Sequence, residues 1–173
     1  YQLQKQYLRL AWSDSRLDMS YDFKPVGVSQ ASLNSVNGVI QTMKKDCVCG
    51  SQKRFAECCE PLLNGSRSAV TPEQLMRSRY SAYSLGGYGN YLLKTWFAPM
   101  AKDLSIEDLS RSDTEWVGLQ IIDSGVSGNS GWVEFKAVYN DNSRPVEMHE
   151  KSVFTLQGQR WFYVGGEVSR SEL

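Results

Sequence analysis

Hydrophobic and polar residues alternate with a period of two through the second half of the chain. This alternation is typical of β-strands with one buried face. Between the alternating runs lie turn sequences rich in Gly, Asn, Asp and Ser. The pattern predicts four strands, at Trp116–Asp123, Gly131–Asn140, Arg144–Leu156 and Gln159–Gly165. The last two separators, Asp141-Asn142-Ser143 and Gln157-Gly158, are short enough to require antiparallel hairpins.

Alternation also predicts which residues share a face of the sheet. In the second strand, one face carries Val133, Phe135, Ala137 and Tyr139, and the other carries Trp132, Glu134, Lys136 and Val138. In the third strand, one face carries Val146, Met148, Glu150, Ser152 and Phe154, with Glu147, His149 and Lys151 opposite.

A helical period precedes the strands. Thr71 is a suitable N-cap, followed by Pro72 at the first helical position and Gln74 in a capping box. Apolar residues recur at helical spacing until Gly86-Gly87 ends this helix. Shorter helices are expected at Tyr88–Phe97 and from Ser105 onward. Helices followed by a β-meander predict an α+β domain, with helices on one face of a curved antiparallel sheet.

Three segments follow from these patterns. Residues 1–45 have only weak periodicity, so a strand, an amphipathic turn and an extended arm all stay open there. Residues 46–66 contain the cysteines and many turn formers, and residues 67–173 contain the predicted α+β domain.

Composition and charge narrow the function classes. The formal net charge is +0, which argues against general DNA binding, because such proteins need a basic excess to displace counterions. No stretch approaches the roughly 20 apolar residues that span a bilayer, and no secretory pattern is visible near Tyr1. A cytoplasmic protein without membrane association is therefore expected.

The four cysteines, Cys47, Cys49, Cys58 and Cys59, lie within thirteen residues. One short loop with four thiolates can supply the tetrahedral ligand set that zinc prefers. The alternatives are disulfides, of which a Cys58–Cys59 bridge would be strained, and a redox role for free thiols. Four protein ligands leave no open position for a substrate, so the zinc is expected to be structural.

Residues around the cysteines fit an electron-rich metal site. The turn at Gly50 and Ser51 can point backbone N–H groups at sulfur. Four basic residues can offset the negative charge of a zinc tetrathiolate and could form a small patch for an anionic partner: Lys44, Lys45, Lys53 and Arg54.

The segment Cys47-Val48-Cys49-Gly50-Ser51, with its final Cys58-Cys59 pair, resembles the SEC-C motif. More narrowly, the run from Leu75 to Tyr83 and the ending from His149 to Gly166 resemble the YchJ-type bacterial proteins. The resemblance implies a bound zinc and a main domain similar to the nuclear transport factor 2 (NTF2)-like fold, a cone of curved sheet and helices. It assigns no activity. In the preprotein translocase ATPase a similar motif, with histidine as its last ligand, contacts a chaperone and the ribosome.

Two function hypotheses follow. The first is a zinc-stabilised interaction module that docks on a protein or ribonucleoprotein partner. The second is a small-molecule-binding or enzymatic cone domain, in which the zinc segment is purely structural and His149 is the one available imidazole base. No catalytic set of nucleophile, base and orienting residue is evident. The candidate pocket residues are Tyr80, Tyr83, Trp96, Trp116, Trp132, Glu134 and His149.

Overall fold

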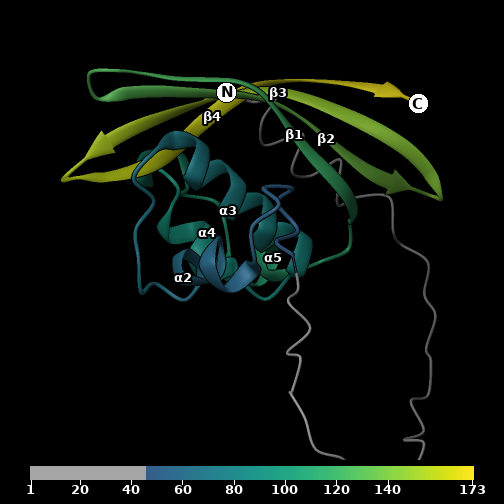
Figure 1. Cartoon of the computed structure of the whole chain (residues 1–173), viewed down its shortest axis with the longest axis horizontal. Helices are drawn as coiled ribbons and strands as arrows, with labels where there is room; N and C mark the ends of the chain where they lie inside the picture. Colours follow the sequence, from purple (N-terminus) through teal and green to yellow (C-terminus); the bar gives the residue numbers. More distant parts are fainter. Residues whose placement is uncertain (1–45) are drawn as a thin grey trace, which may run out of the picture. The chain divides into compact units, whose positions relative to one another are not determined.

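A computed structural model describes residues 46–173 and shows one antiparallel sheet with helices against it (Figure 1). The sheet is a meander in which neighbours in sequence are neighbours in space, in the order β1-β2-β3-β4. The strands are β1 (Glu115–Ser127), β2 (Ser130–Asp141), β3 (Arg144–Gln157) and β4 (Arg160–Glu172). The helices α2 to α5 lie together on one face of this sheet (Figure 1), so the predicted α+β class is confirmed.

The face that the helices cover holds the hydrophobic core. On β2 it carries Val133 and Phe135, and on β3 it carries Phe154, all at most 1% exposed. Because β2 and β3 pair without a register shift, the alternation predicted from the sequence holds along both strands. Irregular pairing within β1 and near Val153–Phe154 bends the two outer strand pairs.

The main helix is α3 (Pro72–Leu85), and it begins as the sequence predicts. The Thr71 hydroxyl accepts a hydrogen bond from the Gln74 N–H at 3.1 Å, and Gly86, with φ of +67°, caps the other end. Before it lie the 3₁₀-turn η1 (Phe55–Glu57) and α2 (Glu60–Leu63). After it come α4 (Gly89–Lys94), η2 (Ala98–Met100) and α5 (Ile106–Ser110).

The second helix is shorter than predicted, because Tyr88–Phe97 is not helical throughout. Trp96 instead forms a parallel bridge with Tyr163 of β4. The Tyr163 N–H donates to the Thr95 carbonyl at 2.9 Å, and the Phe97 N–H donates to the Tyr163 carbonyl at 2.7 Å. Hydrogen bonds to a distant strand thus replace the last helical turn.

The strands are longer than the alternating pattern predicts. β1 and β2 pair as far as Ser127 and Ser130, so only Gly128 and Asn129 connect them. β4 continues beyond Gly165 to Glu172, where it pairs with Val146. Between residues 46 and 173, none of the helices is long and apolar enough to cross a membrane. The hypotheses for Tyr1–Lys45 lie outside the described residues.

Candidate metal centre

Two chain segments bring the cysteines together. Cys47 and Cys49 lie in a tight loop that an antiparallel bridge between Asp46 and Arg54 closes. Inside the loop, the Cys47 N–H donates to the Lys53 carbonyl at 2.8 Å. Gly50 adopts φ of +72°, a conformation that glycine takes without steric cost. The second pair, Cys58 and Cys59, follows η1 directly and leads into α2.

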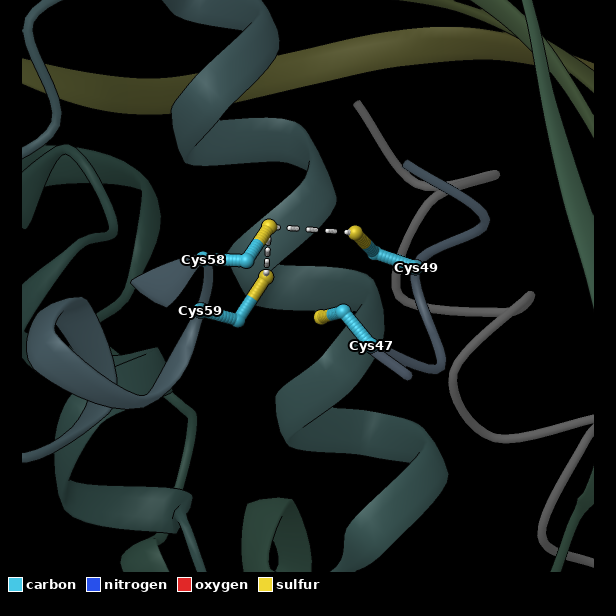
Figure 2. Close-up of side chains that lie close together, drawn as sticks. All are labelled: Cys47, Cys49, Cys58 and Cys59. Atoms are coloured by element: carbon cyan, nitrogen blue, oxygen red, sulfur yellow. Dashed lines mark hydrogen bonds between the residues drawn. The ribbon is translucent and has the colours of Figure 1, made fainter. Parts of the chain in front are cut away.

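The four sulfur atoms turn toward a common centre (Figure 2). All four Sγ atoms lie within 4.8 Å of one another. Cys58 Sγ is 3.7 Å from Cys49 Sγ and 3.8 Å from Cys59 Sγ. A zinc ion with Zn–S bonds of about 2.3 Å requires sulfur–sulfur separations of about 3.8 Å in a tetrahedron. A disulfide would bring two sulfurs to about 2.05 Å, so all four thiols are free.

Burial favours a closed site. Cys47, Cys49 and Cys59 are 5%, 0% and 1% exposed, and only Cys58 is partly accessible. Soft thiolate donors without carboxylate or water positions suit zinc in a structural site. The chemistry and spacing of the donor set therefore fit one tetrahedrally bound metal ion.

Hydrogen bonds within the cluster make the thiols unequal. Bonds from the Cys47 and Cys59 side chains lower the pKa of Cys49, against burial, and the side chain and backbone of Ser51 lower it further. Burial raises the pKa of Cys58, although the Ser51 hydroxyl lies 3.1 Å from its sulfur. The pKa of Cys59 is raised because its thiol bonds to Cys47 and Cys49.

Contacts from α3 and β1 hold the loop against the domain. Arg77 Nη1 donates to the Cys49 carbonyl at 2.8 Å, while Arg77 Nε pairs with Glu73 at 2.8 Å. The Ser81 hydroxyl lies 3.9 Å from Cys47 Sγ. A side chain at Gly50 would come within 3.0 Å of the Leu119 carbonyl. The metal loop is therefore seated on the same elements that build the core.

The predicted partner patch is only partly described. Lys53 and Arg54 are exposed on the metal loop, and Arg54 forms an ion pair with Glu57. Lys44 and Lys45 lie outside the described residues.

The candidate pocket residues fall on opposite faces of the sheet. On the helix side, Tyr80 and Trp116 meet edge to face at 5.7 Å, and Trp96 is 6% exposed. That side also includes Tyr83, whose pKa is raised mainly by burial.

The remaining candidates occupy the face that no described helix covers. There, His149 Nε2 lies 2.8 Å from Glu134 Oε1, and the Trp132 ring covers Gly125. The sheet separates His149 from the aromatic cluster, so these residues do not line one pocket.

A buried polar network also lies on the helix side of the sheet. Arg79, 3% exposed, donates to the Leu92 carbonyl at 3.0 Å and to Thr95 Oγ1 at 2.8 Å. Glu150, 8% exposed, accepts hydrogen bonds from Ser152 at 2.6 Å and Tyr163 at 2.8 Å. The sequence contained one indication of this network, because alternation places the acidic Glu150 on the same strand face as the apolar residues of β3.

The Glu150 carboxyl predicts a pH-dependent stability. Burial raises its pKa, against hydrogen bonds from Ser152 and Tyr163 and the charge of Arg79, which lower it. The folded state therefore holds the proton more tightly than the unfolded state, and the free energy of unfolding falls as pH rises from about 4.3, the unfolded value, through the folded pKa.

Glu150→Gln should remove this loss, so the variant should gain stability relative to wild type as pH rises. Urea denaturation at a series of pH values measures the difference. Glu167→Gln, at an exposed glutamate of β4, is the control. The same pH trend in both variants would contradict the assignment.

The sequence of this chain matches a protein family and several bacterial relatives. The family model described as the YchJ middle NTF2-like domain matches residues 71–166. A UPF0225 protein of Shewanella is 36% identical over 142 residues, covering 76% of this chain and 86% of the relative. A UPF0225 protein of Vibrio parahaemolyticus is 34% identical over 133 residues, covering 75% of this chain and 79% of the relative.

Solved structures show the same fold. A SEC-C motif containing protein from Rhodopseudomonas palustris has a TM-score of 0.66 at 34% identity, over 71% of this chain and 98% of the other. A second SEC-C motif containing protein, from Psychrobacter arcticus, has a TM-score of 0.62 at 28% identity, over 73% and 84% of the two chains. This chain therefore belongs to the YchJ family, and its sheet and helices form the family's NTF2-like domain.

Proposed function

We propose that the chain binds one zinc ion through Cys47, Cys49, Cys58 and Cys59 and serves as an interaction module that docks on a protein or ribonucleoprotein partner. The observation that carries the metal assignment is the mutual approach of four sulfur atoms within 4.8 Å. The ion would neutralise the thiolates and cross-link the two cysteine segments.

The contacts of the metal loop suggest that this cross-link fixes a surface for a partner. Between the cysteine pairs, the loop exposes Gln52, Lys53 and Arg54, while its backbone is anchored by Arg77 of α3. A metal-fixed loop presents these side chains in one conformation, which reduces the entropy lost when a partner binds. Zinc would occupy all four thiols and leave no open ligand position for a substrate, so recognition is the function that the loop supports best.

Charge favours an anionic partner surface. The formal net charge of the whole chain is +0, so a cation on the loop would act locally. Lys53 forms no ion pair with another described residue, whereas the Arg54 charge is offset by Glu57. Exposed cations of this kind contribute mainly to association rate and to salt dependence.

Lys53→Glu tests the docking hypothesis. Reversal of this charge should weaken partner binding about tenfold and reduce its salt dependence. The fold should persist, because Cys47 bonds to the backbone carbonyl of Lys53. Co-sedimentation with purified ribosomes and quantitative affinity capture from bacterial extract measure the binding.

The matched control is Lys151→Glu, at an exposed lysine of β3. Zinc content should stay at one ion per chain in both variants. Docking through the metal loop would be refuted by Lys53→Glu protein that retains its metal and the same partners, at the same strength, as the control.

A further inference from the structure

A cavity separate from the metal centre opens between the helices and the start of β4. Its volume is about 340 Å³, which is within the usual range of small-molecule sites. The segment after α2 forms one wall, with Asn64 and Arg67, and α4 forms another, with Asn90 and Lys94. Arg160, at the first position of β4, closes the third side.

All charged residues that line the cavity are basic. Arg67, Lys94 and Arg160 line it, and its lining contains no Asp or Glu side chain. Among residues 46–173, none of these three cations is paired with a carboxylate. Arg67 donates instead to the backbone carbonyl of Glu57 at 3.3 Å. In a chain with a formal net charge of +0, three cationic residues that line one cavity without a carboxylate favour an anionic ligand.

The rest of the lining suits a ligand with an organic body. Tyr88, Tyr91 and Trp161 supply aromatic surface, and Leu62 and Leu75 supply apolar surface. Two of these aromatic groups are held in place by hydrogen bonds. The Tyr91 hydroxyl lies 2.6 Å from Ser78 Oγ, and Trp161 Nε1 donates to the Val70 carbonyl at 3.2 Å. This wall is therefore largely preformed.

We propose that this cavity binds a small phosphate monoester. Arg67, Lys94 and Arg160 take the phosphate, and the aromatic wall of Tyr88 and Tyr91 contacts the organic body. A monoester carries about −1.5 to −2 charges at pH 7, which matches several cations better than a single carboxylate does. Guanidinium groups bind phosphate oxygens in pairs, and Lys94 adds a point charge.

Titration of the zinc-loaded full chain with adenosine 5′-monophosphate tests the proposal. Isothermal titration calorimetry should give a dissociation constant between about 1 μM and 1 mM. In ¹⁵N-labelled protein, the amide signals of Gly65, Ser68 and Asn90, which line the cavity, should shift. Inorganic phosphate should bind more weakly, and adenosine should not saturate.

Charge-neutral variants localise the site. Lys94→Gln and Arg160→Gln should each weaken binding about tenfold, whereas Lys102→Gln, at an exposed lysine outside the cavity, should leave it unchanged. All three positions are exposed, so the fold should persist.

Four results would overturn the proposal. The first is a titration that does not saturate up to about 10 mM nucleotide, and the second is adenosine that binds as tightly as adenosine 5′-monophosphate. The third is citrate that binds more tightly than the phosphate ester, and the fourth is an unchanged affinity in both Lys94→Gln and Arg160→Gln. Loss of partner docking in the Lys53→Glu variant is a separate readout, so the two proposals can fail independently.

Discussion

Cys49→Ser is expected to abolish stoichiometric zinc binding and to produce the largest loss of stability among these variants. Cys49 is 0% exposed, and its sulfur lies 3.7 Å from Cys58 Sγ. A hydroxyl is a poor zinc ligand, and the three remaining thiols cannot complete the tetrahedral ligand set. Structural zinc contributes on the order of 10 kcal/mol to folding in small zinc modules. Part of the core here is independent of the metal, so a loss of about 5 kcal/mol is expected.

Elemental mass spectrometry of the purified protein measures the first effect, and thermal unfolding followed by circular dichroism measures the second. Ser51→Ala is the matched control, because it removes the hydroxyl 3.1 Å from Cys58 Sγ and leaves all four thiols. It should retain one zinc per chain. Chelation of the wild-type metal should reproduce the Cys49→Ser melting curve. A Cys49→Ser protein with a full equivalent of zinc would refute the tetrathiolate assignment.

Arg79→Ala is expected to destabilise the domain by about 3 kcal/mol. Its guanidinium is buried between α3, α4 and the sheet, and lies 4.6 Å from the Tyr163 ring centre and 5.0 Å from that of Trp96. Alanine would leave a cavity, remove one of the donors to the Leu92 carbonyl and remove a positive charge that lowers the pKa of Glu150. Three separate losses therefore act at one position.

Urea denaturation of Arg79→Ala measures the change in the free energy of unfolding. Arg144→Ala, at an exposed arginine of β3, controls for the loss of a guanidinium and should change stability by less than about 0.5 kcal/mol. Arg79→Lys should recover only part of the loss, because an ammonium cannot stack on two rings as a planar guanidinium does. Equal stability of the two alanine variants would show that the buried network is not a stabilising element.

Local sequence determined the elements whose contacts are close along the chain. The metal ligands could be predicted because all four cysteines lie within thirteen residues, so chain length alone keeps the sulfurs near one another. The helix from Pro72 to Leu85 could be predicted because its caps, Thr71 and Gly86, are adjacent to it. The hairpins followed from alternation and short turns, both of which are local.

Only the tertiary structure decided the features that depend on distant partners. Trp96 leaves its helix because Tyr163, far along the chain, offers backbone hydrogen bonds. His149 is separated from Tyr80, Trp96 and Trp116 because adjacent strand positions face opposite sides of the sheet, and the helices cover one side (Figure 1). Arg67, Lys94 and Arg160 meet around one cavity although they are far apart in sequence. Such convergence depends on how α2, α4 and β4 pack, which no local pattern encodes.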